Sequence, residues 1–194
     1  MNVLFVCTGN ICRSPMAAGL FAAHALRHGL PCTVRSAGLL AEGEPAASGA
    51  IDVLAARGVD LARHRSTTMT PTMIDGADLV LTMERRHVRC VVARRPDAFS
   101  RTFTLPDLVA RSRRRGGPLE GDSTTDWLGR MHEGRSAHAL LQPDPTDEID
   151  DPLGGGAEQF EDTARRLDAL VSSLIGTMAM LPVRPLPVGA LATT

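Results

Sequence analysis

A short apolar run near the start of the chain leads directly into a loop that carries a cysteine, a glycine and an arginine. Residues 3–6 read Val-Leu-Phe-Val, as expected of a strand buried on both faces of a sheet. Residues 7–15, Cys-Thr-Gly-Asn-Ile-Cys-Arg-Ser-Pro, follow at once and end in a serine–proline pair typical of a helix start, with Ser14 as the N-cap. A strand, a tight loop and a helix in immediate succession predict a parallel α/β sheet, whose ligand crevice opens at the carboxyl end of its strands.

The rest of the chain repeats this alternation of strand and helix. Apolar residues recur with helical spacing in four segments, namely 15–28, 46–57, a segment ending near residue 93, and 157–175. Short runs rich in apolar or β-branched residues predict three further strands, at 33–35, 78–82 and 101–105. The alternation favours right-handed crossovers and therefore a parallel sheet with helices packed on it.

The composition of the first loop suits a bound anion. Gly9 has no Cβ and Asn10 tolerates the left-handed conformation, so successive backbone N–H groups can turn inward as an anion nest. The following helix N-terminus and the guanidinium of Arg13 add positive potential, which stabilises a thiolate at Cys7 or a phosphate. The Ser14 hydroxyl is placed to hydrogen-bond the Cys7 sulfur. The loop lacks the Gly-Lys-Ser/Thr of a Walker nucleotide site and the three glycines of a Rossmann fingerprint.

This loop resembles the signature of the low molecular weight protein tyrosine phosphatases. Further similar blocks follow in the family's order, at 35–38, 58–61, 64–66, 77–83 and, before three glycines, 151–152. The resemblance covers most of residues 1–176. It implies an α/β fold of three layers with a central four-stranded parallel sheet flanked by helices, and a phosphate loop at the carboxyl end of the first strand.

The resemblance also implies an activity. The chain is expected to hydrolyse phosphotyrosine and small aryl phosphates through a cysteinyl-phosphate intermediate. Cys7 would be the nucleophile and Arg13 would bind the phosphate. Asp151 would protonate the leaving oxygen and then activate water. Alignment of the motif favours Asp151 over its neighbour Asp150, although both carboxyls, or a plain turn before the last helix, are open interpretations of the Asp-Asp-Pro sequence.

The remaining site residues come mainly from the same loop. Those expected to contact substrate are Thr8, Gly9, Asn10, Ile11, Cys12, Ser14 and, beyond the loop, Leu40. By resemblance, Ser36 and His64 are expected to join Asn10 in holding the loop in its strained shape. Cys12 lies five residues from Cys7, so we hypothesise a reversible disulfide that forms with peroxide and is reversed by reductant. No metal or cofactor is expected, because the guanidinium and backbone dipoles neutralise the phosphate.

Other activities on this fold remain open. Thioredoxin-coupled arsenate reductases share the loop but need two further redox cysteines downstream. Here Cys90 has no second cysteine near it in the sequence, and Cys32 lies before the second similar block, so a redox relay is difficult to build. Relatives that hydrolyse phosphoarginine carry threonine where this chain has Ile11. An apolar branched side chain there offers no hydrogen bond to a guanidinium and narrows the slot over a flat ring, which favours phosphotyrosine.

Two further observations bear on the site. Many family members place aromatic residues around the cleft, where this chain has Leu39, Leu40 and Leu153, so we expect a more open, aliphatic rim. A non-catalytic phospho-ligand-binding module is disfavoured, because such a module would not need Cys7 and Asp151 together.

The chain of 194 residues is expected to form one catalytic domain over 1–176 and a mobile C-terminal tail over 177–194. Residues 111–150 are interpreted as an extended insertion before the acid loop, with a helix near 125–141. The arginine run at 111–115 is interpreted as a solvated loop in preference to a binding site for an acidic partner. A net charge of −1 disfavours nucleic acid as a partner, and no stretch is suited to cross a membrane. Four cysteines without metal spacing, and no secretory leader ahead of the first strand, indicate a cytoplasmic protein. Its expected partner is a phosphotyrosine-containing protein, with a monomer favoured.

Overall fold

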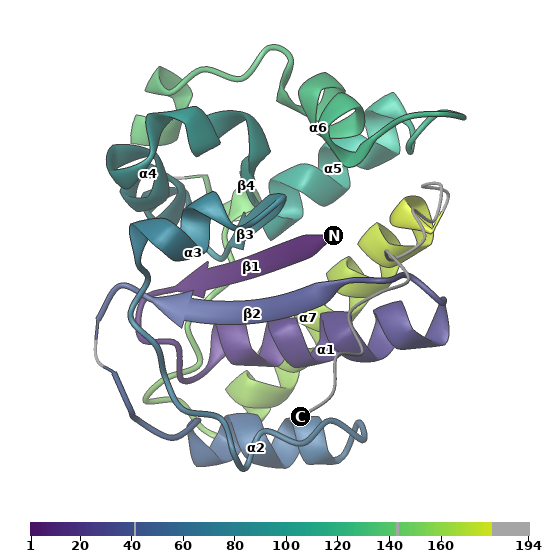
Figure 1. The fold of residues 1–194 in the computed structure, drawn as a ribbon. Coiled ribbons are helices and arrows are strands. Elements are labelled where there is room, and N and C mark those ends of the chain that lie inside the picture. The colour runs from purple at the N-terminus through teal and green to yellow at the C-terminus, as the bar shows by residue number, and fades with distance from the viewer. Residues whose placement is uncertain (41, 143, 180–194) are drawn as a thin grey trace, which may run out of the picture.

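A computed structural model describes residues 1–40, 42–142 and 144–179. Its centre is a four-stranded parallel sheet in the order β2-β1-β3-β4, flanked by helices on both faces (Figure 1). The strands are β1 (Asn2–Cys7), β2 (Thr33–Gly38), β3 (Leu79–Thr82) and β4 (Thr102–Thr104). All of the predicted strands are confirmed, and so is the three-layer α/β fold. Because the chain moves from β1 to β2 on one side and then to β3 on the other, the strand order reverses at β1. A ligand crevice is expected at the carboxyl end of that strand.

Alternate residues of β1 face two separate cores, as the strand period of two requires. Val3 and Phe5 pack in the larger core, against α1 (Arg13–Arg27) and α7 (Ala157–Met178). Leu4 and Val6 face the smaller core, which α3 (Pro71–Asp75) and α4 (Arg85–Arg94) cover. The helix α2 (Ser48–Ala55) packs on α7 at the edge of the larger core. Burial on both faces explains the unbroken apolar run at the start of the chain.

The start of α1 differs from the prediction that Ser14 is its N-cap. The helix begins at Arg13, and Cys12 occupies the N-cap position without a side-chain hydrogen bond. The Ser14 side chain lies inside the first turn and is turned toward the Cys7 sulfur, 3.0 Å away. The hydroxyl therefore serves the loop and not the helix terminus.

The arginine run at 111–115 is not a loop as predicted, because it forms the last turn of α5 (Leu105–Arg115), although Arg113, Arg114 and Arg115 are exposed to solvent as expected. Its N-cap Thr104 accepts a hydrogen bond from the backbone of Asp107, and its buried residues Leu105, Leu108, Val109 and Ser112 lie on one stripe. Three arginines in the last turn suit the negative end of the helix dipole. The single predicted helix at 125–141 is also wrong: α6 (Thr124–His132) ends sooner, and residues 138–141 form a separate 3-10 turn.

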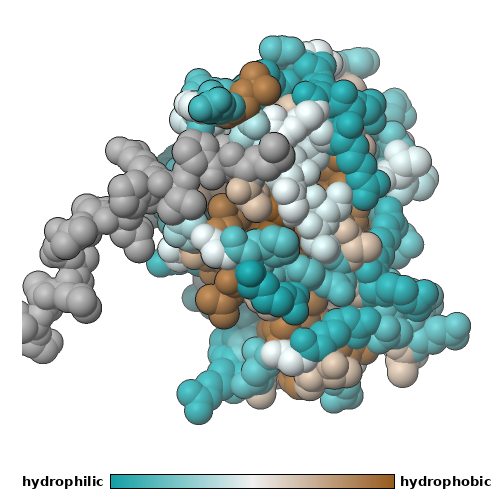
Figure 2. All heavy atoms as spheres, turned by 90° about the vertical axis from the view of Figure 1, so that its right-hand side faces the viewer, coloured by the Kyte–Doolittle hydropathy of each residue, from teal (hydrophilic) through white to brown (hydrophobic). Residues whose placement is uncertain are grey.

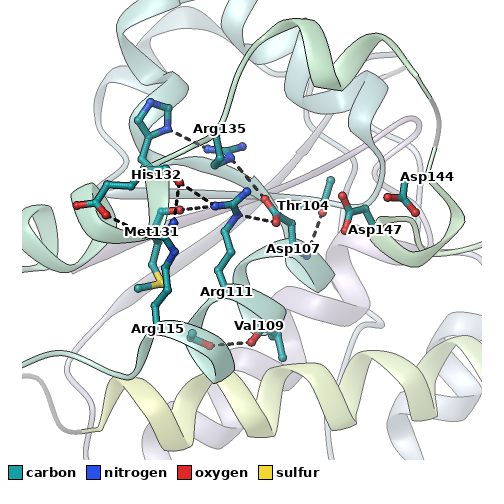
Figure 3. Close-up of polar contacts among 12 residues, drawn as sticks. Thr104, Asp107, Val109, Arg111, Arg115, Met131, His132, Arg135, Asp144 and Asp147 are labelled. Carbon is teal, nitrogen blue, oxygen red and sulfur yellow. Dashed lines mark hydrogen bonds and ion pairs between the residues drawn. The ribbon is translucent and has the colours of Figure 1, made fainter.

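Two partly buried arginines, Arg111 and Arg135, hold residues 111–150 against the rest of the chain (Figure 3). The Arg135 guanidinium lies 4.7 Å and 4.0 Å from the ring centroids of Phe99 and Phe103, and donates to the Thr102 carbonyl at 2.7 Å. Burial lowers the pKa of Arg135 to about 10. Arg111 joins α5 to the end of α6 through the Met131 carbonyl, as Figure 3 shows. The described part of residues 111–150 is thus packed against the rest of the fold.

Three short 3-10 helices complete the described elements, at Pro96–Arg101, His138–Leu141 and Pro145–Asp147. The helix α7 runs to Met178, so residues 177–178 are helical and not part of a tail. The rest of the predicted tail, from residue 180, lies outside the described residues. Figure 2 shows the face at the amino ends of the strands, where hydrophilic residues separate several apolar patches. In the described ranges we find no helix with the length and apolarity that a membrane span requires.

Candidate active site

The loop after β1 is held in a conformation that few sequences adopt. Asn10 has φ of 53°, the only positive value of a non-glycine residue in the described part of the chain. The loop also lies directly against the end of β2. A Cβ at Gly38 would lie 2.9 Å from the Thr8 carbonyl oxygen and 3.0 Å from the Asn10 Cβ. Only glycine permits this approach, so Gly38, the last residue of the similar block at 35–38, helps to shape the loop.

Two donors meet at the buried sulfur of Cys7. The backbone N–H of Asn10 donates to Sγ at 3.2 Å, and the Ser14 Oγ lies 3.0 Å from it. Ser14 accepts a hydrogen bond from the Asn10 Nδ2 at 2.9 Å, and its single proton can point either at the sulfur or at the Ala37 carbonyl oxygen, 3.4 Å away. Hydrogen bonds to the charged form stabilise a thiolate. The site thus suits a sulfur nucleophile.

Hydrogen bonds from outside the loop hold Asn10 in place. Asn10 Nδ2 donates to the Ser36 Oγ at 2.8 Å, and His64 Nε2 lies 2.7 Å from the Asn10 carbonyl oxygen. Because a carbonyl only accepts, the proton is on His64 Nε2. The structure therefore brings together the three residues predicted to hold the loop. It adds Thr67, whose backbone N–H donates to Asn10 Oδ1 at 2.9 Å.

Arg13 is buried beneath the loop, with 1% of its surface exposed. Its Nη1 donates to the Glu84 carboxylate and, at 3.1 Å, to the Ile149 carbonyl, while Nη2 donates to Asp151. Its Nε is also buried but has no partner among the described residues. A buried N–H without an acceptor is costly, and a phosphate oxygen at this position would satisfy it.

Of the neighbouring pair Asp150 and Asp151, it is Asp151 that contacts Arg13. Its Oδ2 accepts from Arg13, and its Oδ1 accepts from the backbone N–H of Leu153 at 3.2 Å. Its side chain is 39% exposed, so the group also faces solvent. The segment before it is anchored by the Ile149 N–H, which donates to the Met83 carbonyl at 2.8 Å. The neighbouring Asp150 is exposed.

Besides Thr67, three site residues were not predicted, and these three lie where β3 leads into α4. Burial alone would raise the pKa of Glu84, but hydrogen bonds from Arg86 and Arg13 outweigh it, and the pKa is lowered. His87 is fully buried, with its Nε2 3.0 Å from the Thr8 Oγ1, and burial lowers its pKa to about 4. Arg86 Nη2 donates to the same Thr8 oxygen at 3.1 Å. The sequence did offer a signal for these residues, because polar side chains follow directly after the predicted strand at 78–82. The carboxyl ends of parallel strands lie at the same edge of a sheet, so these side chains could be expected near the loop.

The other predicted residues lie around the loop. Ile11 is half-buried, and Leu40 and Leu153 are exposed, in keeping with an aliphatic rim. The backbone N–H of Leu40 donates to the Thr8 carbonyl at 3.1 Å, which places this residue beside the loop. Cys12 is buried, and its pKa is raised to about 12 by burial and by the charges of Asp151 and Cys7. No group of three or more His, Cys, Asp or Glu side chains in the described ranges is arranged to hold a metal ion.

Residues 2–122 match the family model described as low molecular weight phosphotyrosine protein phosphatase. The protein-arginine-phosphatase of Geobacillus stearothermophilus is 42% identical over 142 residues, which are 73% of this chain and 88% of the relative. The low molecular weight protein-tyrosine-phosphatase Etp of Escherichia coli K12 is 41% identical over 105 residues, which are 53% of this chain and 67% of that protein. The crystal structure of a low molecular weight protein tyrosine phosphatase from T. tengcongensis superposes with a TM-score of 0.70 at 34% identity, over 92% of this chain and 99% of the other.

Proposed function

This chain belongs to the low molecular weight phosphotyrosine protein phosphatase family and is a phosphatase, and we propose that it hydrolyses phosphotyrosine in proteins through a cysteinyl-phosphate intermediate. The observation that supports this most strongly is the convergence of Cys7, Arg13 and Asp151 on one loop. Each supplies a different requirement of phosphoryl transfer: a sulfur nucleophile, a cation for the phosphate oxygens, and a carboxyl that exchanges a proton.

In the first step the phosphate monoester enters the loop and its oxygens accept from backbone N–H groups and the Arg13 Nε. The Cys7 thiolate attacks phosphorus, and a sulfur–phosphorus bond forms as the bond to the ester oxygen breaks. Asp151 gives its proton to that oxygen, which leaves as a neutral phenol. The Ser14 hydroxyl and Asn10 N–H steady the sulfur before the attack and after it is released.

In the second step a water molecule attacks the phosphorus of the phosphocysteine. The Asp151 carboxylate takes a proton from that water, the sulfur–phosphorus bond breaks, and Cys7 leaves as a thiolate. Inorganic phosphate is the product. The Arg13 guanidinium faces the equatorial oxygens in both steps, so no metal is required to offset their charge.

Phosphotyrosine is favoured over phosphoarginine because of Ile11. Its apolar side chain lies in the loop and offers no hydrogen bond to a guanidinium, while its bulk suits one face of a flat ring. Phosphoarginine is the second candidate substrate, since a relative 42% identical to this chain is named a protein-arginine-phosphatase. Arsenate reduction is disfavoured because Cys32 lies just before β2, at the amino ends of the strands, whereas Cys7 lies at their carboxyl ends.

The experiment is hydrolysis of p-nitrophenyl phosphate by the wild type, Cys7→Ser and Asp151→Asn, with Cys32→Ser as the matched control. We expect no turnover by Cys7→Ser, strongly reduced turnover by Asp151→Asn and full turnover by the control. Activity that survives Cys7→Ser would refute the mechanism. Phosphate binding without turnover by the wild type would indicate a phospho-ligand-binding module instead. Comparison of kcat/KM for a phosphotyrosine peptide and a phosphoarginine peptide with the same flanking sequence then decides the substrate.

A further inference from the structure

A second arginine stands at the edge of the phosphate loop, and it comes from a different part of the chain. Arg86 lies in the first turn of α4, with 51% of its side chain exposed. Its guanidinium nevertheless reaches the loop, where Nη2 donates to the Thr8 Oγ1 at 3.1 Å. Thr8 directly follows Cys7. The exposed cation is therefore tethered next to the position of the nucleophile.

The charge of Arg86 is only partly offset. Its carboxylate partner is Glu84, whose Oε2 lies 2.6 Å from the Arg86 Nε. The same carboxylate also accepts from the buried Arg13, so two guanidinium groups share one negative charge. The other partner of Arg13 is Asp151, which must be protonated and neutral when it acts as the acid of the proposed first step.

In that protonation state Arg13 and Arg86 carry two positive charges against the one negative charge of Glu84, and the Glu148 carboxylate acts on Arg86 electrostatically without forming an ion pair with it. Arg13 is 1% exposed and faces the phosphate, and the Glu84 side chain is 15% exposed, so Arg86, at 51%, is the cation of this group that lies open to the rest of the substrate. His87 adds no charge near neutral pH, because burial lowers its pKa to about 4. The mouth of the site thus presents a cation to whatever group is attached to the phosphate.

From these contacts we propose that Arg86 is a specificity-determining residue, which disfavours a cationic phosphorylated side chain and favours a neutral aryl phosphate. This inference rests on the proposed phosphatase function and concerns its substrate. A phosphoarginine guanidinium would add a like charge beside Arg86, whereas a phenyl ring is attracted by a neighbouring cation. The mechanism is electrostatic, and therefore differs from the steric and hydrogen-bonding effect assigned to Ile11.

The test compares kcat/KM for a phosphotyrosine peptide and a phosphoarginine peptide of the same flanking sequence. The variants are Arg86→Met, which removes the charge, and Arg86→Lys, which keeps it. Arg94→Met is the matched control, because Arg94 is an exposed arginine on the same helix whose Nη1 bonds only the Cys90 carbonyl within its own helix. We expect Arg86→Met to raise the phosphoarginine-to-phosphotyrosine ratio about tenfold at low salt. Arg86→Lys and the control should stay near the wild-type ratio.

Salt provides a second readout. Added sodium chloride should reduce the discrimination of the wild type and leave that of Arg86→Met unchanged, because screening acts only on the charged variant. An unchanged ratio in Arg86→Met, or equal behaviour of the Met and Lys variants, would overturn the role of Arg86 while leaving the phosphatase function intact. A wild type that hydrolyses only the phosphoarginine peptide would instead overturn the proposed substrate and this inference together.

Discussion

Replacement of the buried His87 is expected to remove a large part of the pH dependence of stability. Burial lowers the pKa of this ring from 6.5 to about 4, so the unfolded chain binds the proton more readily than the folded chain. The free energy of unfolding must then decrease as the pH falls from 6.5 toward 4. At 1.36 kcal/mol per pKa unit, the full effect is about 3 kcal/mol, of which about 2 kcal/mol is lost between pH 7 and pH 5.

The interval from pH 7 to pH 5 isolates this effect from the carboxylates. The lowered pKa of Glu84, for example, gives stability that is present above its unfolded value of 4.5 and is lost only below it. His132 has a pKa lowered by burial and contributes with the same sign as His87, but it is unchanged in the variant and cancels in the comparison.

The assay is urea-induced unfolding at pH 7, 6 and 5 for the wild type, His87→Gln and the exposed-histidine control His28→Gln. Glutamine keeps a donor for the Thr8 hydroxyl but has no titrating group. Between pH 7 and pH 5 the wild type and the control should each lose about 2 kcal/mol more than His87→Gln. Parallel pH profiles for all three proteins would refute the reasoning.

Three further predictions concern the loop and its acid. Asp151→Asn should lower kcat for phosphotyrosine about 100-fold or more, whereas Asp150→Asn should cost far less; a larger loss for Asp150→Asn would transfer the acid role. Ile11→Thr should raise kcat/KM for phosphoarginine relative to phosphotyrosine, and an unchanged ratio in peptide assays would contradict the specificity argument. The raised pKa of Cys12 keeps it a thiol, so its disulfide with oxidised Cys7 should form slowly. Once formed, the disulfide protects Cys7 from further oxidation, so inactivation by peroxide should be reversed by reductant in the wild type and not in Cys12→Ser; mass spectrometry that finds only sulfinic acid at Cys7 of the wild type would count against this hypothesis.

Much of the site was predictable because its residues are close together in the sequence or carry strong local preferences. The apolar strand, the glycine and asparagine that curve the loop, and the arginine at the helix start all lie within residues 3–15. The contacts of Ser36 and His64 with Asn10 are as the resemblance implied. The predictions within residues 3–15 needed no knowledge of how distant strands pair, whereas Ser36 and His64 were predicted from the resemblance alone.

The missed residues depend on such pairing. Glu84, Arg86 and His87 lie 71 to 79 residues beyond their partners in the loop, and they meet it only because β3 pairs with β1 in register. The arginine run of α5 was misjudged for a different reason: its apolar stripe begins at Leu105, which also fits the end of a strand. The consecutive arginines at the end of α5 were then interpreted as a solvated loop, although positive charges in the last turn of a helix interact favourably with its dipole.

The most direct test of the account is whether the phosphoryl group passes through Cys7. Asp151→Asn lacks the base for the second step, and p-nitrophenyl phosphate has a leaving group that needs little acid assistance, so the intermediate should accumulate in this variant. Acid quenching during turnover, followed by mass spectrometry of the peptide that contains Cys7, should find one phosphoryl group on its sulfur. Turnover with no phosphoryl group on Cys7, or with the group on another residue, would contradict the mechanism.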